Sequence, residues 1–503
     1  MARRSRSEAL GSGSSLDARS QLPKHRQVYV ALRDAILNGS MAAHSPLPST
    51  RQLASELGVS RNTVLAAYEL LLGEGFVVSH GGAGTFVSPD AIRQEPIRQE
   101  AAPPEPRALS ALADELRVRR APSASNPARA FRPSSPAVDL FPATAWSRML
   151  SRALRVGGPG DMTDGDVAGY RPLRERVAEH LRVSRSCRCS YEQVIITTGG
   201  QLALALCAML LIDPSDAVWY EEPGYPEGRL AYGMITRRFI PVPVDQSGID
   251  IAAGKRLSPK PRIIYTTPQH QWPLGSQMPV QRRLALLEFA TACGAWIVED
   301  DYDGDLRFDG KSYAALQSLD ESQRVIHVGT FSKAFFPGLR IGYAVVPPDL
   351  IDAFTAGRSV LDRFPNTVAQ IALAEFMDSG LYAKHVRRMQ QAYAERHDLL
   401  RARVETKLSG ALSILPAFAG TFSVAQLTAG RDDAAIVRSL AEAGFESVAL
   451  SSTYAGMQRR NGLILGHAIA TPEAIRAGVD ELERLFAEGL SSPEPAALRP
   501  RSG

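Results

Sequence analysis

Apolar residues near the start of the chain recur at the spacing of amphipathic helices. Tyr29, Leu32 and Ile36 lie three and four positions apart, which places them on one face of a helix. Similar patterns return over 53–57 and 64–72, each after a serine or threonine that can cap a helix. Three successive helices are therefore predicted within the first 75 residues.

The next apolar runs, 76–78 and 85–87, flank a glycine-rich turn and predict a hairpin. Two helices, a short turn at Gly58-Val59, a third helix and a hairpin are the order of a winged helix-turn-helix. We place this small α+β domain at residues 22–90. In this fold the third helix meets DNA bases with its first turn, while the preceding helix and the wing meet phosphates. The residues expected at DNA are Arg51, Arg61, Asn62, Thr63 and the wing glycines Gly82 and Gly84.

From residue 137 onward, short apolar runs end in polar or glycine-rich turns and are followed by helical stretches. This alternation predicts an α/β domain over residues 137–490, with a mainly parallel sheet between helices. Ligands of such sheets bind beyond the carboxyl ends of the strands, so the residues after each strand are candidate site residues. The predicted strands are 194–196, 218–220, 263–265, 296–298 and 325–328.

Composition changes between the two domains and at both ends of the chain. Residues 91–136 are rich in proline, alanine, arginine and glutamate, which indicates a semi-extended linker. Residues 1–21 are predicted to be a basic flexible arm and residues 491–503 a flexible tail.

The overall composition excludes several classes of protein. The 503 residues carry a net charge of only +4, so bulk charge does not indicate nucleic-acid binding. Four cysteines without a matching second pair predict neither a disulfide framework nor a metal site. The longest apolar run, 202–212, is too short for a membrane span, and no signal peptide is recognisable. We expect a cytoplasmic protein without a membrane partner.

The last predicted strand leads to Lys333, within the sequence Gly-Thr-Phe-Ser-Lys. A lysine amine can hold an aldehyde as a Schiff base. The hydroxyls of Thr330 and Ser332, together with the guanidinium group of Arg340, could hold a phosphate. These groups suggest pyridoxal 5′-phosphate (PLP) as a cofactor. The competing interpretation of the motif is a surface lysine that follows a strand.

The other strand ends supply the remaining groups that this cofactor needs. They offer a glycine turn for the phosphate, a ring for stacking, a polar partner for the phenolic oxygen and a carboxylate for the ring nitrogen. Such a carboxylate keeps the nitrogen protonated, so the ring can accept electrons. The candidates are Gly199, Gly200, Tyr225, His270 or Gln271, a carboxylate within 299–303, and Tyr302 as donor to the ring hydroxyl.

Two parts of the sequence resemble known families. The stretch LPSTRQLASELGVSRNTVLAAYELLLGEGFV, with GGAGTFV after it, resembles the GntR-type winged-helix regulators. The phrases DPSDAVWYEEPGYP, TTPQHQWPLG, AWIVEDDYDGDLRFDG and VGTFSKAFFPGLRIGY resemble fold-type I PLP-dependent aminotransferases, in particular the MocR/GabR-type regulators that fuse such a domain to a GntR-type head.

The resemblance implies roles for individual residues. In the head, Arg51, Ser60, Arg61 and Thr63 would lie near the operator. In the large domain, Lys333 would form the Schiff base, Asp300 rather than Glu299 would pair with the ring nitrogen, Tyr302 would lie near the phenolate, and Tyr225 would stack on the ring. The implied phosphate ligands are Thr198, Gly199, Gly200, Thr330 and Arg340.

Two positions depart from the aminotransferase pattern. Where an arginine usually binds the substrate carboxylate, this chain has Asn461-Gly462. Either Arg459 or Arg460 replaces that arginine, or the effector has no carboxylate in the usual place. Asp164 stands where a tyrosine that reaches the partner subunit's phosphate is expected, and an acidic group there would repel the phosphate.

The expected function is a PLP-dependent transcriptional regulator. Its aminotransferase-like domain would sense an amine or amino-acid effector, or PLP itself, through an aldimine on Lys333, and the resemblance implies a homodimer on operator DNA. The alternative is an active aminotransferase with an accessory DNA-binding head, because intact cofactor residues allow residual transaminase activity.

Overall fold

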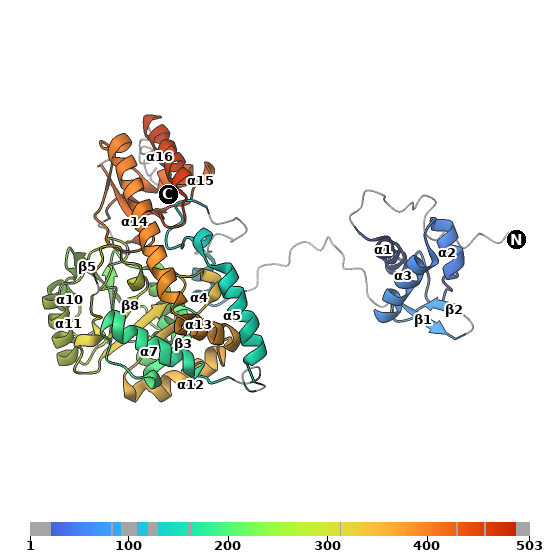
Figure 1. The fold of residues 1–503 in the computed structure, drawn as a ribbon, viewed down its shortest axis with the longest axis horizontal. Coiled ribbons are helices and arrows are strands. Elements are labelled where there is room, and N and C mark those ends of the chain that lie inside the picture. The colour runs from blue at the N-terminus through green and yellow to red at the C-terminus, as the bar shows by residue number, and fades with distance from the viewer. Residues whose placement is uncertain are drawn as a thin grey trace, which may run out of the picture. The chain divides into compact units, whose positions relative to one another are not determined.

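The computed structural model describes residues 22–81, 84–91, 108–118, 129–158, 160, 163, 165–311, 313–428, 431–456 and 459–488. The chain divides into two compact units, Met1–Arg119 and Arg120–Gly503 (Figure 1). The predicted arm 1–21 and tail 491–503, together with Gly82 and Asp164, lie outside the described residues.

Within the first unit, three helices and a two-stranded wing pack together, as the sequence pattern predicted. The helices pack around the buried side chains of Leu32, Leu53 and Val64. The wing strands pair in antiparallel fashion, with Val77 opposite Val87. The elements are α1 (Lys24–Leu37), α2 (Thr50–Leu57), α3 (Arg61–Gly73), β1 (Val77–His80) and β2 (Gly84–Val87).

Local chemistry explains where the helices of the first unit begin. The hydroxyl of Ser49 accepts the backbone N–H of Gln52 at the start of α2, and the hydroxyl of Ser60 accepts that of Thr63 at the start of α3. Gly58 ends α2 with φ 62°, in the left-handed region that glycine adopts without strain. The turn between α2 and α3 is thus set by local sequence. Farther along, one short helix, α4 (Ala111–Val118), falls within the predicted linker.

An eight-stranded sheet forms the centre of the second unit, in the order β3-β10-β9-β8-β7-β4-β5-β6. The pairs among β9, β8, β7, β4 and β5 are parallel, whereas β10 runs antiparallel to both of its neighbours. The predicted mainly parallel sheet is confirmed. The strands are β3 (Val194–Thr197), β4 (Val218–Glu222), β5 (Phe239–Asp245), β6 (Gly248–Ile249), β7 (Ile263–Thr266), β8 (Trp296–Asp301), β9 (Val325–Thr330) and β10 (Gly342–Val345).

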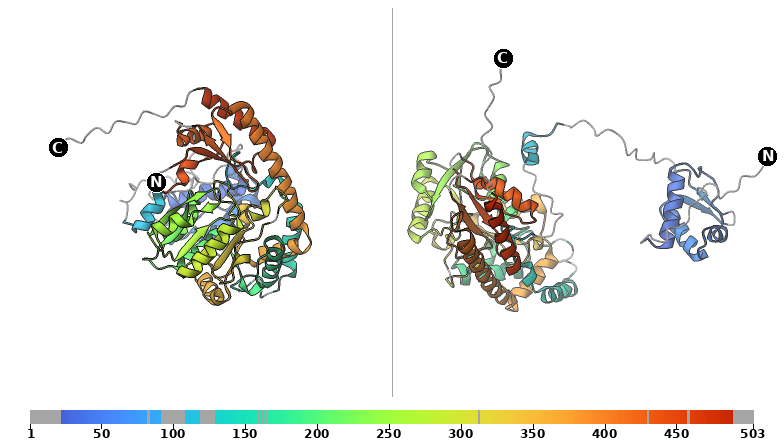
Figure 2. Two further views of the ribbon diagram at one scale, coloured as in Figure 1. Left: turned by 90° about the vertical axis from the view of Figure 1, so that its left-hand side faces the viewer. Right: turned by 90° about the horizontal axis from the view of Figure 1, so that it is seen from above.

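Helices cover both faces of this sheet (Figure 2). Side chains alternate between the faces, so Ile195 packs into one core while its neighbours Val194 and Ile196 pack into another. Such two-sided burial explains why the strands read as continuous apolar runs. The helices are α5 (Ala143–Val156), α7 (Arg171–Arg185), α8 (Gly200–Leu211), α9 (Pro226–Gly233), α10 (Ile251–Leu257), α11 (Val280–Cys293), α12 (Ile351–Asp362) and α13 (Thr367–Asp378).

A smaller antiparallel sheet follows the long helix α14 (Leu381–Leu408). Its order is β11-β12-β14-β13, and α14 and α16 pack on it around a separate apolar core. None of the helices among the described residues is long and apolar enough to cross a membrane. The remaining elements are β11 (Leu412–Ile414), β12 (Ser423–Leu427), α15 (Asp433–Glu442), β13 (Val448–Ala449), β14 (Gly462–Leu465) and α16 (Pro472–Ala487).

Residues 129–136 differ from the extended linker predicted for 91–136, because they pack on the large unit. Phe131 is fully buried in the core of the smaller sheet, and its ring lies where a Cβ at Gly478 would collide with it. Arg132 forms an ion pair with Glu446 at 2.8 Å. The linker was predicted from the local, proline-rich composition, whereas this packing depends on residues more than 300 positions away in the sequence.

This packing leads to a stability prediction for Phe131→Ala. The substitution is expected to lower the free energy of unfolding of the large domain by about 3–5 kcal/mol, because it removes a buried ring and leaves a cavity. Denaturant unfolding measures the change. Leu109→Ala is the control, since Leu109 is 51% exposed and should change stability by less than about 0.5 kcal/mol. Equal effects of both substitutions would contradict the packing of residues 129–136.

Candidate functional site

A cavity of about 150 Å³ lies at the carboxyl ends of β8 and β9. Most of the residues predicted from the strand ends meet there. These are Gly200, Tyr225, Asp300, Tyr302, Thr330, Ser332, Lys333 and Arg340. Residues that the sequence did not point to complete the lining: Ser134, Gln201, Leu204, Trp272 and Pro337.

The pleat of β8 selects one carboxylate out of three consecutive ones. Asp300 lines the cavity, whereas its two neighbours point to the opposite face of the sheet. Glu299 accepts backbone N–H groups from Leu316 at 2.6 Å and Gln317 at 3.0 Å. Asp301 accepts the guanidinium Nε of Arg185 at 2.8 Å. The geometry therefore favours Asp300 over Glu299 as the partner of a ligand.

Asp300 is a buried carboxylate that is suited to a cationic partner. The hydroxyl of Tyr265 donates to its Oδ2 at 2.8 Å. Burial raises the pKa of Asp300 to about 7, an effect that outweighs the hydrogen bond from Tyr265. A cation beside this carboxylate would stabilise its charged form, as a protonated ring nitrogen would.

Lys333 is half-buried and lines the same cavity. Removal of water around it lowers its pKa, although Asp303 and Asp300 partly offset this effect. A lowered pKa increases the fraction of neutral amine, which is the nucleophilic form. In this structure the amine donates a hydrogen bond to the backbone oxygen of Ser134 at 2.9 Å.

Groups suited to a phosphate gather where α8 begins. Arg340 donates to the backbone oxygen of Thr198 at 2.7 Å, which holds its guanidinium group beside the glycine turn. A Cβ at Gly199, where φ is 85°, would lie 3.2 Å from this guanidinium group. Thr330 donates to the hydroxyl of Ser332 at 3.1 Å. A guanidinium group, two hydroxyls and a helix N-terminus are typical of a phosphate site.

Thr198 and Gly199 do not themselves line the cavity. The hydroxyl of Thr198 donates to Asp362, and its backbone oxygen accepts the guanidinium group of Arg340. Thr198 therefore positions Arg340 through its carbonyl oxygen. The contact between Thr198 and Asp362 could not be predicted from local sequence, because α12 brings Asp362 to the turn.

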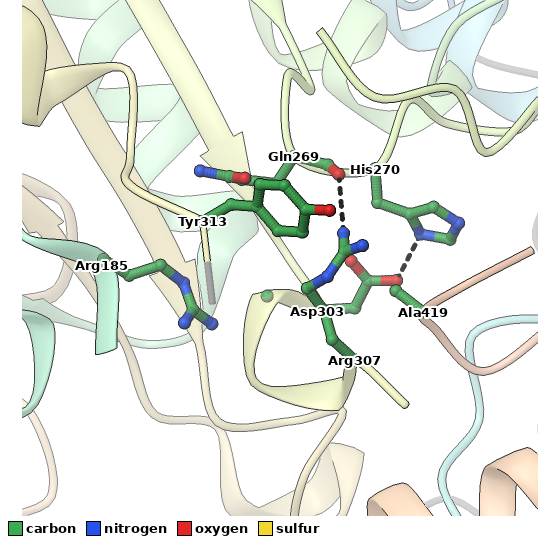
Figure 3. A pocket seen from close by; sticks show the side chains of 8 residues that line it. Arg185, Gln269, His270, Asp303, Arg307, Tyr313 and Ala419 are labelled. Atoms are coloured by element: carbon green, nitrogen blue, oxygen red, sulfur yellow. Dashed lines mark hydrogen bonds and ion pairs between the residues drawn. The ribbon is translucent and has the colours of Figure 1, made fainter. Parts of the chain in front are cut away.

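Tyr302 is held by its neighbours at the edge of the cavity. Its hydroxyl lies 3.0 Å from Nδ1 of His270 and donates to the His270 backbone oxygen at 3.1 Å. The same Nδ1 lies 2.7 Å from Oδ2 of Asp303. Figure 3 shows this His270–Asp303 pair in a second, much smaller cavity of about 10 Å³, beside Arg307 and Tyr313.

Gln271 lies apart from the cavity that it was predicted to serve. Its amide donates to the backbone oxygen of Pro223 at 2.9 Å and to Glu221 at 3.2 Å, and the side chain is buried in that loop. The next residue, Trp272, lines the cavity instead. Sequence gives no signal for this difference, because both residues belong to one irregular loop.

Arg459 and Arg460 are also not brought to the cavity. Both side chains are exposed, and Arg459 donates to the backbone oxygen of Gly456 at 3.2 Å. Asn461 is exposed and donates to the backbone oxygen of Arg431. Among the described residues, Arg459, Arg460 and Asn461 therefore form no effector carboxylate site at the cavity.

The predicted DNA contacts of α2 and α3 lie around the starts of these two helices. Arg51, Ser60, Arg61 and Asn62 are exposed around the starts of α2 and α3, and Thr63 is half-buried beside them. Arg61 donates to the hydroxyl of Thr50 at 3.3 Å, so its guanidinium group bridges the two helices. The wing residue Gly84 has φ 112°, a conformation that favours glycine.

Comparisons with known proteins match both parts of the chain. Residues 24–87 match the model for bacterial regulatory proteins of the gntR family, and residues 158–464 match the model for aminotransferase class I and II. The protein named probable rhizopine catabolism regulatory protein MocR, from Rhizobium meliloti, is 38% identical over 94% of this chain and 95% of its own length. The chain belongs to the MocR-type regulators.

Other proteins are also similar to most of this MocR-type chain. The pyridoxine biosynthesis transcriptional regulator PdxR of Corynebacterium glutamicum is 28% identical over 90% of this chain and 93% of its own length. The kynurenine aminotransferase of Pyrococcus horikoshii, solved in complex with PMP, matches with a TM-score of 0.67 at 26% identity, over 77% of this chain and 96% of that one. The predicted fold class is thereby confirmed.

Family membership also confirms the predicted cofactor, pyridoxal 5′-phosphate, and a DNA-binding head. The cavity fits that cofactor by its chemistry. It combines an amine with a lowered pKa, a buried carboxylate with a raised pKa, and a guanidinium group beside a helix N-terminus. These are the partners that an aldehyde, a pyridine nitrogen and a phosphate require.

Proposed function

We propose that this MocR-type regulator senses an amine or amino acid, or PLP itself, at Lys333 and changes its binding to operator DNA in response. The observation that supports this is the single cavity where Lys333, Asp300 and Arg340 meet, in a chain that also carries a DNA-binding head. An amine effector needs a site at which a primary amine can replace Lys333, and this cavity offers one.

Each part of the cavity has a distinct task in this proposal. Lys333 would hold the aldehyde, Asp300 would keep a proton on the ring nitrogen, and Arg340 with Thr330 and the α8 N-terminus would hold the phosphate. Tyr225 and Tyr302 line the same cavity and would contact the ring and its hydroxyl. The bound cofactor supplies an aldehyde carbon that an effector amine can take from Lys333.

Regulation requires that the effector bind one arrangement of the protein more tightly than another. An effector shifts DNA binding only by its differential affinity for the two arrangements. The proposed working form is a cytoplasmic homodimer, since paired winged helices read two half-sites of an operator. The net charge of the chain is small, so overall electrostatic attraction contributes little to DNA affinity. Specific side-chain contacts and a second DNA-binding head in a dimer would supply that affinity instead.

An experiment on the full-length protein tests the proposal. Operator duplexes are first selected from a randomised DNA library with the PLP-loaded protein. A library of primary amines and amino acids is then screened for compounds that change the visible absorbance of the bound cofactor, and each positive compound is added to operator-binding measurements. A compound that changes both signals supports the proposal. Absorbance changes that never alter DNA binding would refute it.

The same preparation distinguishes the alternative, an active aminotransferase with an accessory head. Sustained conversion of an amine donor and a keto acid, without sequence-specific DNA binding, would favour the enzyme. The intact cofactor residues are the observation that keeps this alternative open.

Arg61→Ala is expected to weaken operator binding by about 1–3 kcal/mol if Arg61 reads a base. Its guanidinium group is exposed at the first turn of α3, where a recognition helix meets base edges. Binding is measured at fixed salt concentration with the selected operator. Arg33→Ala is the matched control, because Arg33 lies on α1 in an ion pair with Asp34. Unchanged affinity in Arg61→Ala would remove this residue from the interface.

A further inference from the structure

The segment 129–141, here called the strap, connects the cofactor cavity to the smaller sheet. Its first half is bonded to that sheet and the loop before it. The backbone oxygen of Phe131 accepts the N–H of Gly466 at 2.8 Å, and that of Ala130 accepts the N–H of Glu446 at 2.9 Å. The Arg132–Glu446 ion pair adds a side-chain contact in the same place.

The second half of the strap is bonded to the cavity and to α14. The backbone oxygen of Ser134 accepts the amine of Lys333 at 2.9 Å. The N–H of Ala137 donates to the hydroxyl of Tyr393 at 3.1 Å, and Asp139 pairs with Arg396 at 2.7 Å. The strap thus joins Lys333, α14 and the smaller sheet in a single stretch of thirteen residues.

Two residues of the strap hold a conformation that side chains other than glycine rarely adopt. Phe131 has φ 70° and Ser134 has φ 59°, both in the left-handed region. Such residues persist only where surrounding contacts impose the conformation. For Phe131 the contact is its buried ring. Ser134 lines the cavity, and its backbone oxygen accepts the hydrogen bond from the amine of Lys333.

We propose that the strap reports whether the amine of Lys333 is free. A free amine donates to Ser134 and holds the strap in place. When Lys333 condenses with the cofactor's aldehyde, a C=N bond forms, water leaves, and the nitrogen is turned toward the cofactor carbon. Ser134 then loses its donor while the cost of its backbone conformation remains, so the strap loosens.

An effector amine reverses this change. The nitrogen of the effector forms the C=N bond to the aldehyde carbon, and the C=N bond to Lys333 breaks. The two hydrogens that the effector nitrogen loses are transferred to the nitrogen of Lys333. Lys333 can then donate to Ser134 again. The strap continues along the chain directly into the linker that carries the DNA-binding head. The state of one amine therefore changes how firmly the end of that linker is held. This inference rests on the proposed function, because it assumes that an aldehyde occupies Lys333.

Hydrogen exchange on the full-length protein tests the strap. Four states are compared: cofactor-free, with PLP, with PLP followed by O-methylhydroxylamine, and with pyridoxine 5′-phosphate. O-Methylhydroxylamine takes the aldehyde carbon and frees Lys333, whereas pyridoxine 5′-phosphate has the same ring and phosphate without an aldehyde. The reporting amides are those of Ala137, Glu446 and Gly466, which are bonded across the strap.

PLP is expected to accelerate exchange of these amides by roughly tenfold, as the loss of one hydrogen bond implies. O-Methylhydroxylamine should restore slow exchange, and pyridoxine 5′-phosphate should leave exchange as in the cofactor-free protein. The strap proposal alone would be wrong if exchange is equal in all four states while PLP still gives an absorbance that Lys333→Ala lacks. If that absorbance does not form at all, the proposed function and the strap fall together.

A variant pair separates strain in the strap from a general change of stability. Ser134→Gly keeps the backbone oxygen and removes the cost of the left-handed conformation, so the strap should stay in place and the acceleration by PLP should shrink to less than about twofold. Ser186→Gly makes the same substitution at a left-handed serine, φ 55°, on the exposed end of α7. It should keep the full response to PLP. Identical responses of the two variants would contradict the proposal.

Discussion

Lys333→Ala is expected to abolish the visible absorbance that PLP gives with the wild-type protein, while the fold is retained. Among the residues that line the cavity, Lys333 alone carries an amine. Without it the aldehyde has no nitrogen to bond to, and the cofactor is held only by its phosphate and ring contacts. The substitution removes one hydrogen bond, the one from Lys333 to the backbone oxygen of Ser134, so only a small loss of stability is expected.

The measurement is an absorbance spectrum after PLP is added and excess cofactor is removed by dialysis. Far-UV circular dichroism and thermal unfolding establish that the variant is folded. Lys384→Ala, at an exposed position on α14, is the control and should keep the wild-type spectrum. Retention of the absorbance by Lys333→Ala would show that another lysine holds the cofactor.

Asp300→Asn should weaken PLP binding by about 3 kcal/mol, roughly a hundredfold, because a protonated ring nitrogen loses its buried anionic partner. Equilibrium dialysis of PLP measures the effect. Glu299→Gln is the matched control, since Glu299 lies on the same strand but bonds to Leu316, Gln317 and His327 on the opposite face. It should lower stability without changing PLP affinity. If Glu299→Gln weakens PLP binding and Asp300→Asn does not, Glu299 is the partner of the ring nitrogen.

Asp300 also gives the cofactor-free protein a defined dependence of stability on pH. Its pKa is raised in the folded chain from 3.8 to about 7, so between these values the folded state keeps a proton that the unfolded state has lost. The contribution of Asp300 to the free energy of unfolding therefore falls as pH rises from about 4 to about 7, and stays constant above that range. The difference in melting temperature between wild type and Asp300→Asn, followed across pH, isolates this contribution. A difference that does not change with pH would contradict the raised pKa.

The two predictions for the cavity differ in how far the sequence alone supports them. Lys333 follows an apolar strand and has hydroxyls and an arginine close by in sequence, so its chemistry can be recognised from one short motif. Asp300 is one of three consecutive acidic residues, and from composition alone each could serve the ring nitrogen. The pleat of β8 and the partners of Glu299 and Asp301 on the other face favour Asp300.

The sequence by itself determined the elements and their order. Spacing of apolar residues, capping serines and glycine turns depend on neighbours within a few positions, so the winged helix-turn-helix, the five strands and the residues at their ends could be predicted. Tertiary structure decided what depends on distant partners. It turned Gln271 into its loop, left Arg459 and Arg460 at the surface, and placed Ser134 against Lys333, 199 positions away. The proline-rich composition of 91–136 predicts a linker, but Phe131 is buried in a core that other segments form. Because those segments are distant in sequence, no local pattern predicts this burial.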